Sequence, residues 1–432
     1  MTMFLIFAAV VLLLFLGVTT AVTMGFASIA TYLAAGGDMA RLFLVPQRMF
    51  AQVSGITLMS IPFFLLMGNL MSVGGISRSL FGFGRVCLGH RWGGLSNAAI
   101  AASIVMAMSG SAAACAAGIG MIAIGEMTKA GYARPFSCAT IAAGGALGPI
   151  IPPSITLILY AGLTSTSVNA LFEAGVLPGL LLGLAFMGWS SYVSWKNGYA
   201  KADPEPMSVR WAAFKDAFWA LLTPVIVIGG MFGGYFTATE AAAVASLYVM
   251  ALGFFVTKTL KVKDLPRIFW ETVEQTAKVM FVIATAGFFQ YVLLYTRIPQ
   301  ETISFITSNF HSITPVILMI IAILVVMGCF MEGTAILLIT VPIFVPLAKS
   351  FGYDVTQLGI VMCVALAIGV LTPPVGLNLY VMSSITGEKL MAIATNLDAE
   401  ERDALSVLEN VPFFELDNAE CIAEFILSDY FR

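Results

Sequence analysis

The sequence predicts an all-α polytopic membrane protein, and three observations support this fold class. Of its 432 residues, 59% are hydrophobic and only 10% are charged, whereas soluble domains are roughly half apolar and about a quarter charged. The mean hydropathy is +0.95. Long apolar stretches recur along the chain, without the alternating strands that build membrane β-barrels. We therefore expect about 10 to 12 transmembrane segments of about 20 residues each.

The expected membrane segments follow from the apolar stretches. Residues 3–35 lack a basic start and are longer than the apolar core of a signal peptide, so we expect a retained helix there. The segments lie at roughly 3–35, 54–74, 79–106, 109–125, 135–163, 171–195, 217–236, 239–257, 272–297, 313–330, 333–348 and 356–385.

Charged residues predict the orientation and a separate C-terminal segment. Two loops are basic, and two expected helices lie between them. Both loops therefore face the same side of the membrane. The excess of Lys and Arg in these loops indicates that this side is the cytoplasm. Residues 397–432 hold ten acidic and two basic residues, a local charge of −8, while the rest of the chain carries +5. We expect residues 392–432 to form an acidic tail outside the membrane, either a short amphipathic helix or disordered.

An internal repeat links the two halves of the chain. Gly131-Tyr132 recurs as Gly352-Tyr353, Gly148 as Gly369, and Pro152-Pro153 as Pro373-Pro374, always 221 residues apart. A short polar interruption precedes each copy, SGSAAA at 109–114 and EGTA at 332–335. Each half therefore consists of an apolar segment, a polar break, a second apolar segment, a Gly-Tyr loop and a helix broken at its Pro-Pro pair.

The two copies are expected to be inverted. With seven or five membrane crossings between the two Gly-Tyr loops, both odd counts, the second copy faces the opposite way. Counting 313–348 as a single crossing would reverse this conclusion, so that alternative stays open.

The broken helices predict a transport site. Proline removes a helical hydrogen bond and clashes with the carbonyl four residues earlier, and irregular backbone in a membrane is tolerated where it is buried or lines a cavity. Exposed carbonyl oxygens and helix C-terminal ends suit Na⁺, and half-helix N-termini suit an anion. Proline kinks and close helix packing through small residues are the alternative explanation of each motif alone.

These motifs carry a resemblance to a known family. The stretches SGSAAACAAGIGMIAIGEMTKAGY, GALGPIIPPSITLILY and GCFMEGTAILLITVPIFVPLAKSFGYDVTQLGIVMCVALAIGVLTPPVGLNLY resemble the large membrane subunit of tripartite ATP-independent periplasmic (TRAP) transporters. The resemblance covers residues 1–391, with repeat one at about 54–195 and repeat two at about 272–391. It implies two inverted repeats in the bacterial inner membrane, each with a re-entrant hairpin and a Pro-broken helix.

The resemblance also implies an activity. It implies Na⁺-coupled import of an organic anion, such as a C4-dicarboxylate or sialic acid, by an elevator-type motion. A small four-helix membrane subunit and a periplasmic substrate-binding protein are the implied partners, and Na⁺ is the coupling ion, with no other cofactor. The basic stripe expected of nucleic-acid binding is missing, as are motifs of a membrane enzyme such as HExxH.

The resemblance assigns candidate site residues to both repeats. The first Na⁺ site would use carbonyls between Met106 and Ser109 together with Gly148, Ile151 and Pro153. The second would use Gly328, Gly369, Thr372 and Val375, with the Thr372 hydroxyl as a further ligand. The polar lining that meets substrate would be Ser109, Ser111, Ser154, Thr334 and Asn378. Glu332 joins it because an ionisable residue at membrane depth is costly and is a functional candidate by default; a helix-end carboxylate that reaches the interface is the alternative.

Two alternatives remain open on the sequence alone. A carrier of the same hairpin architecture that works without a binding protein would show the same motifs. The acidic C-terminus replaces a hydrophobic helix that is usual in the family, so an inactive truncated or fused permease would also fit.

Overall fold

A computed structural model describes residues 13, 18–91, 93–199 and 201–395, and within these ranges every regular element is a helix. The helices before the first interruption are α2 (Thr20–Ala34), α3 (Leu44–Val53), α4 (Ser60–Val73), α5 (Ile76–Leu88) and α6 (Gly94–Met106). Next come α7 (Ala112–Lys129), α8 (Arg134–Ala146), α9 (Ile155–Thr164), α10 (Val168–Lys196), α11 (Met207–Phe232), α12 (Ala238–Ala251) and α13 (Leu265–Tyr295). The last are α14 (Ile298–Asn309), α15 (Ile313–Gly328), α16 (Gly333–Ser350), α17 (Val355–Gly369) and α18 (Leu377–Thr386).

The helices of the two repeats are separated by the same 221 residues as the sequence motifs. Adding it to α7 gives the bounds of α16, and adding it to α6, α8 and α9 gives the bounds of α15, α17 and α18 to within two residues. The same shift carries α5 onto α14. The predicted hairpins are therefore α6–α7 and α15–α16, and the predicted broken helices are α8–α9 and α17–α18. Their inverted orientation, and the domain boundary at residue 391, stay predictions.

Several predicted segments differ from the observed helices. The segment expected at 79–106 is two helices, α5 and α6, because Gly89 and Gly93 interrupt it and Gly93 adopts φ +82°. The short helices α3 and α14 were not predicted, since their apolar residues are too few to form a spanning segment. Residues 1–12, 14–17 and 396–432 hold much of the first segment and nearly all of the acidic tail, and they lie outside the described residues.

The length of each helix reflects whether it is interrupted. Among the described residues, six helical stretches are long and apolar enough to cross a membrane, including α10, α11 and α13. The shorter apolar helices include α6, α9, α15 and α17, which all end or begin at an interruption. Helix α16 (Gly333–Ser350) also follows an interruption, yet it is among the six long stretches.

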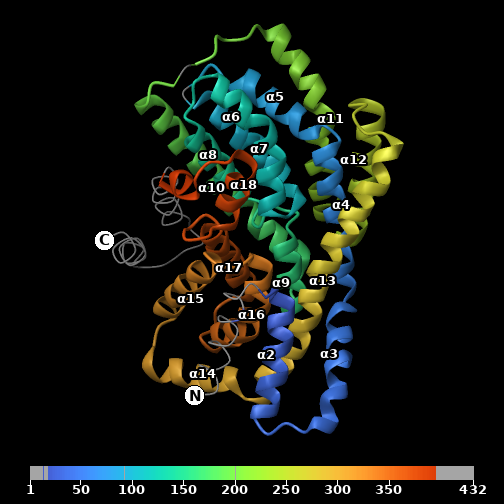
Figure 1. Cartoon of the computed structure of the whole chain (residues 1–432), viewed down its shortest axis with the longest axis vertical. Coiled ribbons are helices and arrows are strands. Elements are labelled where there is room, and N and C mark those ends of the chain that lie inside the picture. The colour runs from blue at the N-terminus through green and yellow to red at the C-terminus, as the bar shows by residue number, and fades with distance from the viewer. Residues whose placement is uncertain (1–12, 14–17, 92, 200, 396–432) are drawn as a thin grey trace.

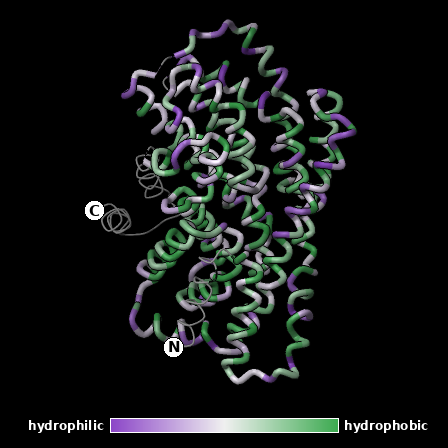
Figure 2. Tube along the Cα trace, viewed as in Figure 1, coloured by the Kyte–Doolittle hydropathy of each residue, from purple (hydrophilic) through white to green (hydrophobic). Residues whose placement is uncertain are grey.

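Large apolar side chains cover the outer surface of the long helices. Trp270, Leu247, Val225 and Phe255 are between 61% and 77% exposed, and Figure 2 shows hydrophobic colour along the outer helices with hydrophilic residues concentrated in connecting loops. Such a surface would be unfavourable in water over this extent. It is the surface expected of helices that contact lipid.

The two repeats exchange their second half-helices. Helix α9 of the first repeat packs against α16 and α17 of the second, and α18 of the second packs against α7 and α8 of the first. Figure 1 shows α9 lying with the second-repeat helices and α18 with the first-repeat helices. The buried Tyr160 of α9 donates a hydrogen bond of 2.7 Å to the Val355 carbonyl of α17. This exchange brings the interruptions of both repeats into one region.

The contact between Tyr160 and Gly359 gives a test of this exchange. A Cβ added to Gly359 would lie 2.6 Å from Cε1 of the buried Tyr160 ring, and overpacking of this kind costs about 1–3 kcal/mol. Gly359→Ala is therefore expected to lower the melting temperature of the detergent-purified protein. Gly125→Ala is the control, because nothing lies within 4 Å of a Cβ added there. Equal melting temperatures for the two variants would contradict the packing of α9 on α17.

Candidate transport site

The first hairpin turns between α6 and α7 inside the protein. Helix α6 ends at Met106, a 3-10 turn spans Ala107–Ser109, and Gly110 adopts φ +70°. Ser111 then caps α7, its hydroxyl accepting a hydrogen bond from the Ala114 amide at 3.4 Å. Because a left-handed backbone suits glycine and a serine is a favourable N-cap, these residue types explain the turn at this point.

The first broken helix is interrupted between α8 and α9. Irregular backbone spans residues 147–153, and both Pro152-Pro153 and Pro373-Pro374 are joined by cis peptide bonds. Ser154 caps α9: its hydroxyl donates to the Pro149 carbonyl at 2.6 Å and accepts from the Leu157 amide at 3.3 Å. Ser154 is fully buried. Its hydroxyl therefore satisfies backbone groups that the interruption would otherwise leave unpaired.

Glycines allow the hairpin turn and the broken helix to touch. A Cβ added to Gly148 would lie 2.9 Å from the Ser111 carbonyl carbon, and one added to Gly110 would lie 2.8 Å from the Ile155 nitrogen. Both neighbours are backbone atoms, which cannot move aside as the end of a side chain can. The absence of a side chain at these two positions is thus required for contact between the interruptions.

In the second repeat the hairpin turn and the broken helix also touch, and we call the two places of contact the first and the second junction. Helix α15 ends at Gly328, and a Cβ added there would lie 2.6 Å from the Gly369 Cα at the end of α17. The Gly376 amide, just before α18, donates to the Cys329 carbonyl at 3.1 Å. The hairpin and the broken helix of this repeat are therefore joined backbone to backbone.

One residue connects the second junction to the first repeat. Asn378, in the first turn of α18, is fully buried. Its backbone N–H donates a hydrogen bond of 3.2 Å to the Val370 carbonyl, and its side-chain Nδ2 donates one of 3.0 Å to the Ala142 carbonyl of α8. Asn378 thus holds the start of α18 against the first broken helix.

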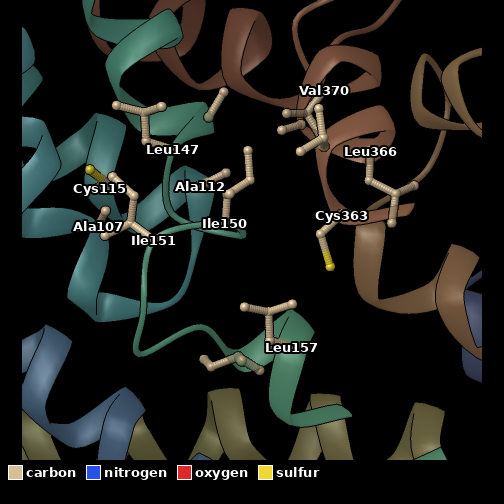
Figure 3. Packing of buried hydrophobic residues seen from close by; sticks show 14 of the residues in the cluster. Ala107, Ala112, Cys115, Leu147, Ile150, Ile151, Leu157, Cys363, Leu366 and Val370 are labelled. Atoms are coloured by element: carbon tan, nitrogen blue, oxygen red, sulfur yellow. The ribbon is translucent and has the colours of Figure 1, made fainter. Parts of the chain in front are cut away.

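All four interruptions meet at one cavity of about 60 Å³. Figure 3 shows buried apolar side chains from both broken helices, among them Leu147, Ile150, Leu366 and Val370, of which the last two also line the cavity. The cavity is lined by Leu65, Gly110, Ser111, Ala112, Ala113, Pro149, Ile155, Thr156, Val279, Glu332, Gly333, Thr334, Leu366, Val370 and Leu377. Residues far apart in the sequence therefore form one site.

The predicted substrate-facing residues fall into two groups. Ser111, Glu332 and Thr334 line the cavity. Ser154 and Asn378 are absent from its lining and use their side chains in the hydrogen bonds described above. Ser109 is also buried, with its hydroxyl 3.5 Å from the Ser111 carbonyl. Leu65 of α4 and Val279 of α13 line the cavity but were not predicted, because nothing distinguishes them from other apolar residues of long helices.

The predicted ligands of the first Na⁺ site lie at the first junction. Met106 and Ser109 bound the hairpin turn, while Gly148, Ile151 and Pro153 lie in the interruption that packs on it. Among the described residues, the carbonyl oxygens of the last three accept no hydrogen bond. Such oxygens in a buried segment are available to a cation, for which oxygen is the preferred ligand.

The predicted ligands of the second Na⁺ site lie at the second junction. Gly328 and Gly369 are in backbone contact, and Thr372 and Val375 follow in the interruption. The Gly369 carbonyl accepts a hydrogen bond from the Thr372 amide at 3.1 Å. The Thr372 hydroxyl donates to the Ile368 carbonyl at 2.9 Å. Val375 is 41% exposed.

Comparison with known proteins identifies the family. The family model described as the tripartite ATP-independent periplasmic transporter, DctM component, matches residues 7–415. The chain belongs to this family. A C4-dicarboxylate TRAP transporter large permease, DctM of Pseudomonas aeruginosa, is 41% identical over 372 residues, covering 86% of each chain. The sialic acid TRAP transporter large permease SiaM of Vibrio cholerae is 38% identical over 340 residues, covering 78% of this chain and 80% of that protein.

A longer relative and two solved structures extend the comparison. The isethionate TRAP transporter permease DctMQ of Oleidesulfovibrio alaskensis is 36% identical over 387 residues, covering 89% of this chain and 61% of that protein. The structure of the YdaH transporter of Alcanivorax borkumensis matches with a TM-score of 0.60 at 14% identity, covering 90% of this chain and 89% of that chain. Neisseria gonorrhoeae MtrF matches with a TM-score of 0.51 at 13% identity, covering 91% and 85%. At these identities the two structures establish a shared fold.

Membership of the TRAP family confirms the broad predictions. The chain is a large TRAP permease, a multi-pass protein of the bacterial inner membrane that acts in secondary transport and is not an enzyme. Large permeases of this family work with a small membrane subunit and a periplasmic binding protein.

The second junction can be tested with two glycine variants. A Cβ on Gly369 would lie 2.7 Å from the Gly328 Cα, so Gly369→Ala is expected to push the end of α17 away from α15 and to lower the melting temperature. Gly333→Ala is the control in the same repeat, because its Cβ would meet only the Leu366 side chain, at ordinary distances of 3.6 and 3.7 Å. A control variant that melts as early as Gly369→Ala would show that the close approach is not the cause.

Proposed function

We propose that this TRAP permease imports an organic anion coupled to Na⁺, receiving it from a periplasmic binding protein and working with a small four-helix membrane subunit. The observation that carries this proposal is the convergence of four helix interruptions on one internal cavity. Paired interruptions in two repeats are typical of the binding site of a secondary transporter.

The helix directions at the cavity favour an anionic substrate. Ala112 and Ala113 begin α7, Ile155 begins α9, Gly333 begins α16 and Leu377 begins α18, and all of them line the cavity. Each helix N-terminus carries unpaired amide groups and a partial charge of roughly +0.5. Because four N-termini point to one place, a carboxylate can be held there without a Lys or Arg side chain.

The opposite helix ends favour Na⁺. Helices α6, α8, α15 and α17 finish at the same interruptions, and their last carbonyls carry partial negative charge. The unpaired carbonyl oxygens of Gly148, Ile151 and Pro153 add hard ligands at the first junction. The hydroxyl of Thr372 adds one at the second. Together these groups support one Na⁺ site in each repeat.

The names of the relatives support the substrate class. Their printed substrates are C4-dicarboxylates, sialic acid and isethionate, and each is a small organic acid that is negatively charged at neutral pH. We therefore infer an organic anion, either a C4-dicarboxylate or a sialic-acid-like carboxylate.

The composition of the cavity wall supports an elevator-type movement. Its polar residues, Ser111, Thr156, Glu332 and Thr334, all come from the hairpins and broken helices. The long helices α4 and α13 contribute only the apolar Leu65 and Val279. A rigid displacement of the hairpins and broken helices past α4 and α13 would therefore carry every polar contact with the substrate across the membrane.

Uptake by reconstituted protein tests the coupling. Proteoliposomes that contain the permease and its small subunit, with binding protein outside, are expected to accumulate radiolabelled succinate or N-acetylneuraminate under an inward Na⁺ gradient. An equal K⁺ gradient is the control and should give only background, because K⁺ is too large for a site fitted to Na⁺. Equal uptake with the two cations would contradict Na⁺ coupling, and uptake without binding protein would favour a stand-alone carrier.

Thr372 provides a test of the second Na⁺ site. Thr372→Val keeps the shape of the side chain but removes an oxygen ligand, and an interaction with a charge is worth about 1.5–3 kcal/mol, or at least about tenfold in affinity. We expect the Na⁺ concentration for half-maximal uptake to rise at least about tenfold, while Thr372→Ser retains the wild-type value. A parallel fall in protein abundance and uptake, with unchanged Na⁺ dependence, would make Thr372 structural.

A further inference from the structure

Glu332 occupies an unusual place in the cavity wall. It is the N-cap residue of α16, yet its side chain makes no capping hydrogen bond. Ser111 and Ser154, at the starts of α7 and α9, do cap their helices with their side chains. The Glu332 carboxylate forms no ion pair with any described residue. It lines the cavity together with Gly333 and Thr334, so its oxygens are available to a ligand.

Within the described part of the chain, no side chain in the cavity lining neutralises this carboxylate. Of the described lining residues, Glu332 is the only one with an ionisable side chain, since the remainder are apolar residues, glycines and the hydroxyl-bearing Ser111, Thr156 and Thr334. A second negative charge placed close to it is disfavoured, because like charges repel. A hydroxyl or ammonium group placed there gains a charge-assisted hydrogen bond.

The cavity therefore has two chemically different parts. Hydroxyl groups and the amides at the helix starts can donate hydrogen bonds, whereas an ionised carboxylate can only accept them. The Ser111 hydroxyl already accepts a bond from the Ala114 amide, so its proton remains for a ligand. A substrate that suits both parts carries an anionic group at the donors and a donor group near Glu332.

We propose that Glu332 is a specificity-determining residue that selects organic acids with a hydroxyl or ammonium group facing it over acids with a second carboxylate there. This inference rests on the proposed transport of an organic anion and narrows its class to hydroxylated or zwitterionic acids.

The proposed selectivity of Glu332 can be tested with organic acids that differ from one another at one end only. We choose succinate, 4-hydroxybutyrate and 4-aminobutyrate, and the six-carbon set adipate, 6-hydroxyhexanoate and 6-aminohexanoate. Affinities for the purified permease with its small subunit are measured by ligand-induced thermal stabilisation, without binding protein, so that the selectivity of that partner does not contribute. We expect the hydroxy or amino acids to bind at least about tenfold more tightly than the matching diacids.

Substitutions assign this preference to Glu332. Glu332→Gln removes the charge at nearly constant volume and should raise the affinity for the diacid relative to its hydroxy and amino analogues by at least about tenfold. Glu332→Asp keeps a carboxylate and should retain the wild-type order. Glu301→Gln, an exposed residue of α14 away from the cavity lining, is the matched control and should change nothing.

The outcomes separate this inference from the proposed function. An unchanged order of affinities in Glu332→Gln, a wild-type preference for the diacids, or no response to any acid would overturn the role of Glu332. Melting temperatures without ligand show whether a variant is folded, and Glu332→Asp provides the second variant if Glu332→Gln is not. Repeating the series in K⁺ tests the coupling ion separately, because binding that ignores Na⁺ would contradict Na⁺ coupling while the order among acids would still report on Glu332.

Discussion

The structure depends on how a membrane protein satisfies backbone groups where a helix stops before it has crossed the membrane. In lipid each unpaired amide or carbonyl is costly, so irregular backbone must find partners inside the protein. Here Ser154 binds the Pro149 carbonyl, Gly376 binds the Cys329 carbonyl, and Asn378 binds carbonyls of both repeats. These bonds leave a few carbonyl oxygens of the first interruption without partners, and those oxygens are the ligands of the proposed first Na⁺ site.

The close packing of the interrupted backbone also requires glycine at the junctions. The interruptions can share one cavity only if their backbones approach closely, and the contacts of Gly148 with Ser111 and of Gly328 with Gly369 leave no room for a Cβ. The crossing of Gly359 over the Tyr160 ring serves the same purpose between repeats. Close approach and satisfied backbone thus favour the same small residues, which explains why they cluster at the interruptions.

Much of this arrangement could be predicted from the sequence because it is encoded locally. The Pro-Pro pairs, the polar breaks and the spacing of 221 residues predicted where the helices of both halves are interrupted. Contacts between distant segments could not be predicted in this way. Nothing in α9 or α18 indicates that each packs on the other repeat, and nothing marks Leu65 or Val279 as cavity residues.

The sequence also does not predict which polar side chains near the interruptions face the cavity. A polar residue next to a broken helix can face a substrate or satisfy the backbone, and both uses need a hydroxyl or an amide. Ser111 lines the cavity, while Ser154 binds the carbonyl five residues before it in the chain. Both cap a helix, so their sequence contexts are alike, and only the path of the surrounding backbone separates them. The α3 and α14 helices were missed for a related reason, because they are too short for periodicity to identify them.

The directions of the half-helices give the proposed transport its coupling. At each interruption one helix ends and the next begins, so a single segment of a few residues presents carbonyl oxygens on one side and amide groups on the other. In the proposed mechanism, a Na⁺ held by the carbonyls would order that segment, and the amides of the same segment would then meet the anion at a smaller entropic cost. The coupling is reciprocal, because an anion bound first would order the carbonyls for Na⁺. Two ions of opposite charge can therefore favour each other's binding through the backbone they share, without touching and without a charged side chain between them.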